Sequence, residues 1–278
     1  MNLDKQSISH SFSKAAAKYD ESAFLQKEVA SRLLERLELM KIKPERILDA
    51  GCGTGYSTKL LAKKYPKGQL VGVDIAPGMI AKAGKNKSLF DKTKYQIADI
   101  EQLPFANNSF DLVFSNLALL WINDQKNLFI ELNRVLKPGG LLIFSTFGTD
   151  TLMELKQSWS KVDQAVHVND FYDMHIIGDQ VYNAQFENTV MDRDIITLTY
   201  KTLTGLMQDI KAVGAHNMNS ERSRGMLGKS KLIQLQDAYE TFRWQDGQLP
   251  ATCEIVYGHA WKKKEAPKGD YHTYQVKI

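Results

Sequence analysis

Short apolar runs alternate with helical patterns through the middle of the chain. Helical periodicity covers residues 57–65 and 125–136, and Pro138-Gly139-Gly140 ends the second helix and starts the last apolar run. This alternation is typical of a parallel sheet whose strands are connected by helices. We therefore predict an open α/β sheet with strands at residues 46–50, 70–74, 95–99, 110–115 and 140–147.

The segments outside this core follow other patterns. Residues 1–46 begin polar and continue as an amphipathic helix over residues 23–40. From residue 151 onward the strict alternation is lost. The order there predicts two late strands with a helical insertion between them, lying over the bound nucleotide. The expected helices are at residues 151–163, 203–213 and 230–243, and the expected strands at 188–200 and 252–261.

A glycine-rich loop follows the first predicted strand. Asp49 precedes Gly51, Gly53 and Gly55, and glycines at this spacing let the backbone approach a ligand with no Cβ in the way. A strand, such a loop and a helix form the nucleotide-binding corner of an open α/β sheet. A dinucleotide fingerprint would place its third glycine at position 56, which is Tyr56. Because a carboxylate suits an ammonium better than a pyrophosphate, we predict a site for S-adenosylmethionine.

Two further carboxylates follow the next predicted strands. Asp74 is placed to accept hydrogen bonds from ribose hydroxyls, and Asp99 could accept one from an adenine amino group. A single aspartate at a strand end is often only a helix N-cap. Asp49, Asp74 and Asp99 fall at equal intervals behind a glycine loop, which favours a shared role in one nucleotide site.

Other interpretations of this region stay open. The glycines could form a turn with a structural role only, the site could serve a nicotinamide-dependent oxidoreductase, or the fold could be a binding module without catalysis. Tyr56 argues against the oxidoreductase, and the intact strand-end carboxylates argue against loss of the donor site.

Composition limits the remaining classes. The 278 residues exceed the roughly 150–200 of a minimal nucleotide-binding sheet, so the chain carries additional structure. A net charge of +4 is mild and does not indicate nucleic-acid binding. Cys52 and Cys253 stand in unrelated contexts, which makes a disulfide framework or a zinc site unexpected. No apolar run approaches the length of a membrane span, and we expect a cytoplasmic protein.

Several short sequence motifs resemble those of known methyltransferases. The glycine loop with Phe110-Asp111-Leu112-Val113 resembles class I S-adenosylmethionine-dependent methyltransferases. More specific short motifs, spread over nearly the whole chain, resemble the malonyl-acyl-carrier-protein O-methyltransferase family of biotin synthesis. They lie at residues 12–20, 99–104, 115–121, 211–217, 249–252 and 257–261. Leu120 and Cys253 depart from the commonest family residues, and the tail beyond Lys264 is longer than usual.

The resemblance implies a fold and an activity. The fold is Rossmann-like, with a seven-stranded, mostly parallel sheet, helices on both faces, an N-terminal helical lid and a helical insertion between the last two strands. The activity is transfer of a methyl group from S-adenosylmethionine to the free carboxylate of a malonyl thioester. The alternative is a methyltransferase for another small acceptor, such as a quinone precursor or a free acid. The implied segments are a lid (1–46), a core (47–200), an insertion (201–248), a final strand (249–262) and a loose tail (263–278).

The resemblance also implies a set of cofactor-binding residues. Separately, His167, His175 and His259 have no ligand-like spacing, so we expect no metal. S-adenosylhomocysteine would be the product. Tyr19 lies in the predicted lid, where its ring or hydroxyl could orient the cationic sulfonium. The expected cofactor-binding residues are Tyr19, Gln26, Asp49, Gly51, Gly53, Gly55, Asp74, Ile75, Met79, Asp99, Ile100, Asn116 and Leu117.

If the methyl group is transferred to a carboxylate, the enzyme needs particular groups around that carboxylate. A carboxylate is already ionised at pH 7, because such groups titrate near ~4, so no general base is required. The enzyme must align it, exclude water and supply a cation. We expect Lys211, Arg222 and Arg224 to act with Tyr19 in catalysis, and Trp121, Lys211, His216 and Asn217 to contact the substrate.

The same basic residues have two other interpretations. They could form a solvated basic face, or they could meet an acidic acyl-carrier protein that carries the malonyl group. Malonyl-coenzyme A is the other acceptor that we expect, and we predict neither a nucleic-acid nor a membrane partner.

Overall fold

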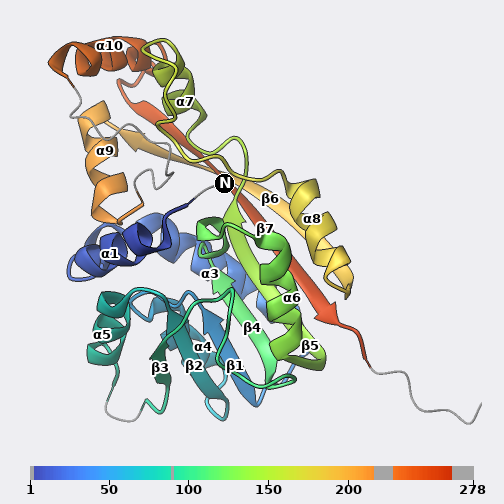
Figure 1. Cartoon of the computed structure of the whole chain (residues 1–278). Helices are drawn as coiled ribbons and strands as arrows, with labels where there is room; N and C mark the ends of the chain where they lie inside the picture. Colours follow the sequence, from blue (N-terminus) through green and yellow to red (C-terminus); the bar gives the residue numbers. More distant parts are fainter. Residues whose placement is uncertain (1–2, 89–90, 216–227, 265–278) are drawn as a thin grey trace, which may run out of the picture.

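In the part of the chain that the structure describes, one seven-stranded sheet forms the centre of the molecule. The computed structural model describes residues 3–88, 91–215 and 228–264 (Figure 1). The strand order is β3-β2-β1-β4-β5-β7-β6, and only β7 runs antiparallel to its neighbours. The predicted mostly parallel sheet is confirmed. The strands are β1 (Arg46–Ala50), β2 (Gln69–Asp74), β3 (Lys94–Ile97), β4 (Phe110–Asn116), β5 (Leu136–Phe147), β6 (Phe186–Tyr200) and β7 (Leu249–Lys262).

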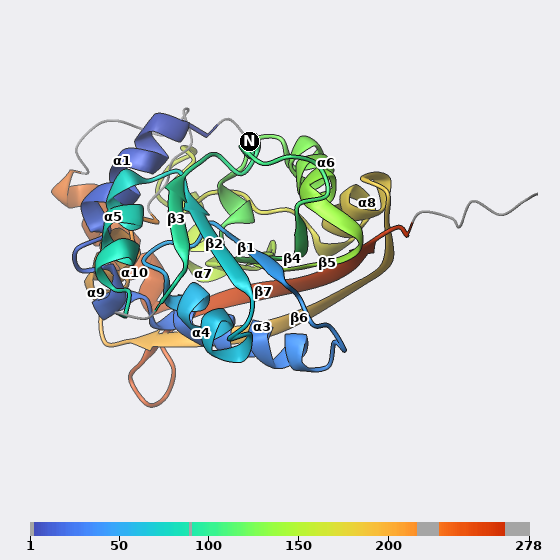
Figure 2. The same ribbon diagram turned by 90° about the horizontal axis from the view of Figure 1, so that it is seen from below.

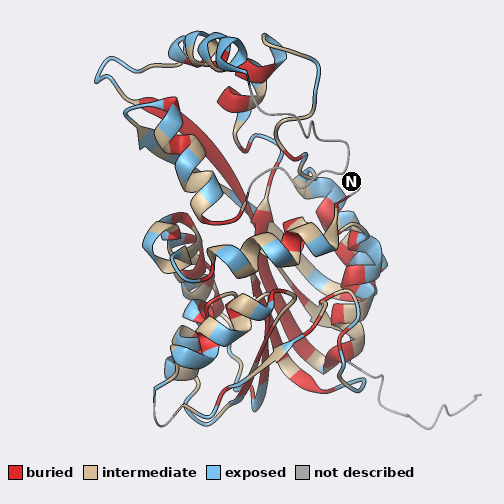
Figure 3. Ribbon diagram, turned by 60° about the vertical axis from the view of Figure 1, so that its left-hand side comes forward, coloured by how far each residue is buried: buried red, intermediate tan, exposed pale blue. Residues whose placement is uncertain are grey.

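Helices cover both faces of the sheet. Helices α3 and α4 pack on one face and α6 and α8 on the other (Figure 2). Successive residues of β4 point to opposite faces of the sheet: Leu112 packs with α3 and α4, and Val113 packs with α6 and α8. Figure 3 shows the buried residues along the strands between these layers. The helices are α1 (Lys5–Ala15), α2 (Tyr19–Ser22), α3 (Phe24–Glu38), α4 (Tyr56–Lys64), α5 (Pro77–Lys85), η1 (Leu119–Trp121), α6 (Gln125–Val135), α7 (Met153–Ser160), α8 (Met174–Asn183), α9 (Leu203–Ala212) and α10 (Lys229–Glu240).

Strands β6 and β7 extend beyond the rest of the sheet. Strand β5 pairs with β7 only as far as Phe147↔Ile255, whereas β6 and β7 stay paired to Tyr200↔Leu249. The extension carries α7, α9 and α10, at the top of Figure 1. Their apolar side chains form a separate cluster on it, which contains Leu155, Trp159, Leu203, Leu206, Leu235, Tyr239, Leu249 and Ala251.

Some element boundaries differ from the predictions. The third strand ends at Ile97, before Asp99, whose side chain accepts the N–H of Glu101 at 3.0 Å in a turn. The fifth strand begins at Leu136 and not at residue 140. Leu136 pairs with Phe110 of β4, and the register then shifts before Leu141 pairs with Leu112, so Pro138 lies within the strand. Helix α8 was not predicted. It buries Ile177 and Val181 against the sheet.

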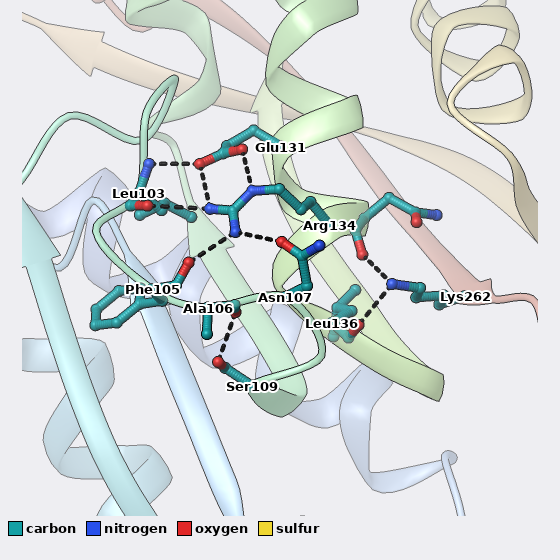
Figure 4. Close-up of polar contacts among 10 residues, drawn as sticks. Leu103, Phe105, Ala106, Asn107, Ser109, Glu131, Arg134, Leu136 and Lys262 are labelled. Carbon is teal, nitrogen blue, oxygen red and sulfur yellow. Dashed lines mark hydrogen bonds and ion pairs between the residues drawn. The ribbon is translucent and has the colours of Figure 1, made fainter.

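Arg134 ties the loop between β3 and β4 to helix α6 (Figure 4). Its guanidinium pairs with Glu131 at 2.7 Å and donates to the carbonyl oxygens of Phe105, at 2.7 Å, and Leu103, at 3.0 Å. Glu131 in turn accepts the N–H of Leu103 at 2.6 Å. The loop that follows Asp99 is therefore held by charged hydrogen bonds rather than by regular secondary structure.

We expect Arg134→Ala to lower the free energy of unfolding by about 1–3 kcal/mol, since it leaves loop carbonyls and Glu131 without their donors. Urea unfolding at neutral pH measures the change. Lys126→Ala is the control, because Lys126 is exposed on the same helix. Equal stability of the two variants would contradict this role of Arg134.

Candidate active site

The glycine loop after β1 requires glycine at two positions in particular. Gly51 has φ +81°, and a Cβ there would lie 2.2 Å from the Cβ of Ala118. Gly55 has φ +84°, and its Cβ would lie 2.7 Å from the hydroxyl of Tyr95. Both values fall in the left-handed region, which disfavours other residues. The N–H groups of Gly51 and Cys52 donate to the carbonyl oxygen of Val73 at 2.9 Å, which fixes the loop against β2.

A cavity of about 680 Å³ lies over this loop and is called the donor cavity here. Its walls come from α1, α2 and the residues that follow β1, β2, β3 and β4. Ten of the predicted cofactor residues line it: Tyr19, Gly51, Gly53, Asp74, Ile75, Met79, Asp99, Ile100, Asn116 and Leu117. The structure thus brings together residues that span nearly 100 positions of sequence.

A smaller pocket of about 400 Å³, the loop pocket, continues from the donor cavity along the glycine loop. The two share Tyr19, Gly51, Gly53 and Asn116, so one elongated ligand could occupy both. Gln26, another predicted cofactor residue, lines the loop pocket.

Asp74 is held in the donor cavity by backbone groups. Its carboxylate accepts the N–H of Gly53 at 2.9 Å and that of Ala76 at 2.8 Å. Burial nevertheless raises the pKa of Asp74 to about 6, because desolvation outweighs these two hydrogen bonds. A carboxylate keeps further lone pairs after two hydrogen bonds, which fits a pair of ribose hydroxyls.

Asp49 lies beneath the loop and lines neither the donor cavity nor the loop pocket. It is 2% exposed and accepts a hydrogen bond from the hydroxyl of Thr58 at 2.5 Å. Burial, above all, raises the pKa of Asp49 to about 7. The predicted contact of Asp49 with the cofactor ammonium stays a prediction: Thr58 occupies one carboxylate oxygen, and the other is buried without a partner among the described residues. Gly55, the N-cap of α4, likewise lines neither space.

Two charged residues missed by the sequence interpretation line the loop pocket instead. Asp20 accepts the hydroxyl of Thr54 at 2.6 Å, and Lys27 donates to the backbone carbonyl of Asp20. They place one carboxylate and one ammonium beside the glycine loop, which complements a free amino acid end. The sequence signal that could have identified Asp20 was its position directly after Tyr19, a predicted cofactor residue.

Lys5 is a third residue that the sequence did not reveal. It lines the donor cavity from α1 and pairs with Asp99 at 2.5 Å and also with Glu101. Asp99 therefore has a protein cation as a partner at the position predicted for adenine. No apolar pattern marks Lys5, because the first residues of the chain are polar.

Helix α1 and the residues around it are fastened over the donor cavity. The N–H of Leu3 donates to Asn123 at 2.6 Å, Ser9 donates to the carbonyl of Ile75 at 3.0 Å, and Ser13 accepts the N–H of Gly78 at 3.1 Å. At Tyr19, burial and then the charges of Asp74 and Asp20 hold the pKa of the hydroxyl well above its usual value. Tyr19 therefore remains a neutral hydrogen-bonding group.

A second large cavity, of about 880 Å³, lies beneath the extension of β6 and β7 and is called the acceptor cavity. Trp121 lines both this cavity and the donor cavity, so the two meet at η1. Its walls are mostly apolar, with residues such as Phe147, Leu155, Leu198 and Leu206. Among the described residues that line it there is no lysine and no arginine.

The predicted cationic clamp has no described member in this cavity. Lys211 is exposed on α9 and lies outside the lining, although its neighbours Asp209 and Ile210 belong to it. His216, Asn217, Arg222 and Arg224 lie outside the described residues.

Residues 3–88, 91–215 and 228–264 contain neither a candidate metal site nor a candidate membrane-spanning helix. These residues contain no group of three or more histidine, cysteine, aspartate or glutamate side chains that could hold a metal ion. None of the helices within the same ranges combines the length and the apolar character that crossing a bilayer requires.

Comparisons with known proteins agree with this geometry. The model of a methyltransferase domain matches residues 48–144, which include the glycine loop and β4. The malonyl-acyl-carrier-protein O-methyltransferase of Gallionella capsiferriformans is 49% identical over 266 residues, which are 94% of this chain and 91% of that protein. The chain belongs to this O-methyltransferase family.

Solved structures of methyltransferases share the fold. The methyltransferase in complex with the Haloferax volcanii Trm112 activator has a TM-score of 0.61 at 16% identity, covering 93% of this chain and 99% of that one. Phosphoethanolamine N-methyltransferase 2 of Haemonchus contortus, solved with S-adenosylmethionine, has a TM-score of 0.54 at 18% identity and covers 91% and 57%. This member of the O-methyltransferase family uses S-adenosylmethionine, and the donor cavity offers residues that fit it.

Asp74→Asn should weaken the binding of S-adenosylhomocysteine about 10–100-fold, because an amide cannot accept as many hydrogen bonds as the carboxylate. Titration calorimetry measures the affinity. Asp111→Asn is a matched control, since Asp111 also accepts two backbone N–H groups, at 2.8 and 3.1 Å, but lines neither the donor cavity nor the loop pocket. A loss of affinity of the same size in the control would contradict the assignment.

The raised pKa of Asp49 predicts a pH dependence of stability. The folded value is about 7, whereas an unfolded aspartate titrates near ~3.9, so the folded state binds more protons between these values. The free energy of unfolding should therefore fall as the pH rises from about 4 to 7.

Asp49→Asn should reduce that slope and be more stable than the wild type at pH 8, as measured by urea unfolding without cofactor. Part of the slope should remain, because the pKa of Asp74 is also raised, to about 6. Asp237→Asn, at an exposed position, should leave the slope unchanged. An unaltered slope in Asp49→Asn would refute the prediction.

Proposed function

We propose that this protein transfers a methyl group from S-adenosylmethionine to the free carboxylate of a malonyl group carried as a thioester by an acyl-carrier protein. The observation that carries the proposal is the meeting of the donor and acceptor cavities at Trp121. The methyl ester formed would enter pimeloyl and biotin synthesis, as the family resemblance implies. The proposed location is the cytoplasm, where acyl thioesters on carrier proteins are used.

The reaction needs alignment and exclusion of water more than proton transfer. When bound, S-adenosylmethionine supplies a methyl group on a cationic sulfur; a carboxylate oxygen forms the new bond to carbon as the carbon–sulfur pair returns to sulfur. The products are a neutral ester and S-adenosylhomocysteine. The apolar walls of the acceptor cavity exclude water from the nucleophile, which strengthens its interactions with the few polar groups present.

Each part of the donor site has a proposed role. Asp74 would accept the ribose hydroxyls and Asp99 the adenine amino group, with Lys5 holding Asp99 in place. Asp20 would accept the ammonium and Lys27 would contact the carboxylate of the methionine end. Tyr19 would face the sulfonium with its neutral ring and hydroxyl.

Transfer of a labelled methyl group tests the function directly. The acceptors are malonyl-acyl-carrier protein, malonyl-coenzyme A, free malonate and a quinone precursor, with the ester identified by mass spectrometry. We expect the malonyl thioesters to be methylated. Transfer only to free malonate or the quinone precursor would establish the alternative, a methyltransferase for another small acceptor. Growth of a biotin-requiring strain that lacks its own enzyme tests the role in biotin synthesis.

Lys211 has a proposed role on the surface rather than in the cavity. It is exposed beside the lining residue Ile210, where it could meet an acidic carrier protein. Lys211→Glu should lower kcat/KM for malonyl-acyl-carrier protein severalfold at low salt and leave malonyl-pantetheine unaffected. Lys126→Glu on α6 is the control. An equal loss with both acceptors would contradict contact with the carrier.

A further inference from the structure

Gln26 stands where the loop pocket and the acceptor cavity meet. It is the one described residue that lines both spaces. Its place is fixed through the backbone, since the side-chain amide of Asn116 donates to the carbonyl oxygen of Gln26 at 3.0 Å. Asn116 is itself held by the hydroxyl of Ser145 at 2.9 Å. The start of α3 is thereby tied to the carboxyl ends of β4 and β5.

The side-chain amide of Gln26 has no hydrogen-bond partner among the described residues. Its Oε1 is buried, whereas its Nε2, which makes no hydrogen bond to these residues either, is not buried. Burying an unpaired polar group destabilises a protein, so such a group at the junction of two cavities indicates contact with a ligand. The amide offers both donors and an acceptor.

The charges around this amide favour contact with a carboxylate through neutral donors. The described lining of the acceptor cavity contains one histidine and one carboxylate, His167, which contacts Asp163 at 2.6 Å, and Asp209. Burial raises the pKa of Cys253 to about 12, so this lining thiol stays protonated. On the loop-pocket side the charged groups are Asp20 and Lys27, and the Lys27 ammonium donates to the backbone carbonyl of Asp20.

We propose that the Gln26 amide positions the acceptor carboxylate, donating from Nε2 to one carboxylate oxygen and leaving the other free to attack the methyl group. Its Oε1 accepts from the ammonium of the donor, so one side chain aligns both reactants. A neutral donor holds the nucleophile without neutralising its charge, and Gln26 itself exchanges no proton. The inference rests on the proposed function, because it requires a carboxylate acceptor.

Gln26→Glu tests this role with a nearly isosteric change. An ionised carboxylate at this position repels the acceptor, whereas protonation at lower pH restores a donor. With malonyl-pantetheine, we expect kcat/KM to fall about 100-fold at pH 8 and to recover at least tenfold at pH 5.5, relative to wild type at each pH. Affinity for S-adenosylhomocysteine should be unchanged or higher.

Gln180→Glu is the matched control. Oε1 of Gln180 is also buried without a partner among the described residues, but it lies on α8 and lines neither the loop pocket nor the acceptor cavity. We expect no pH-dependent recovery there. The inference is wrong if the control shows the same recovery, or if Gln26→Glu loses activity in proportion to its loss of S-adenosylhomocysteine affinity.

A second variant tests the same role of Gln26 in case Gln26→Glu does not fold. Gln26→Met removes the amide at similar volume, and binding to the complex with S-adenosylhomocysteine is compared for malonyl- and acetyl-pantetheine. Wild type should prefer malonyl-pantetheine, and the variant should lose about tenfold of that preference. An undiminished preference would overturn the inference. Absence of methyl transfer to any malonyl thioester by the wild type would instead refute the proposed function.

Discussion

The pairing of β6 with β7 beyond the end of β5 is the feature on which the two-cavity architecture depends. An extended two-stranded ribbon cannot bury its apolar face by itself. Helices α7, α9 and α10 cover that face, and their packing against Leu249 and Ala251 forms a second core. The acceptor cavity lies where this second core approaches the first. The acceptor side is thus a consequence of strand length, while the donor side belongs to the parallel sheet.

Helix α1 connects these two parts of the molecule. Phe12 of α1 packs on Trp121 with ring centroids 5.2 Å apart, and Trp121 lines both cavities. From the same helix, Ser11 donates to the carbonyl of Gly214, just beyond α9, at 3.2 Å. A change in the position of α1 would therefore be transmitted to the donor cavity and to the end of α9 at the same time. Packing, rather than a single hydrogen bond, provides this coupling.

Local patterns predicted the donor side of the protein better than the acceptor side. Strands β1 and β2 and the glycine loop follow from hydrophobic runs and glycine spacing, because these signals arise from residues adjacent in sequence. The positions of Lys5, Asp20 and Lys27 depend on how α1 to α3 dock onto the sheet, which no local pattern encodes. The exposure of Lys211 depends in the same way on the rotation of α9 about its axis. Tertiary packing decides whether a side chain lines a cavity, even where the residue belongs to a recognisable family motif.

The two cavities differ in their dependence on helix α1. Lys5, Ile8 and Phe12 of α1 form part of the wall of the donor cavity, but none of them lines the acceptor cavity. Residues of α7 and α9, such as Leu155 and Leu206, line the acceptor cavity instead. The wall of one cavity thus depends on how α1 docks onto the sheet, and the wall of the other on the helices that cover the extension of β6 and β7.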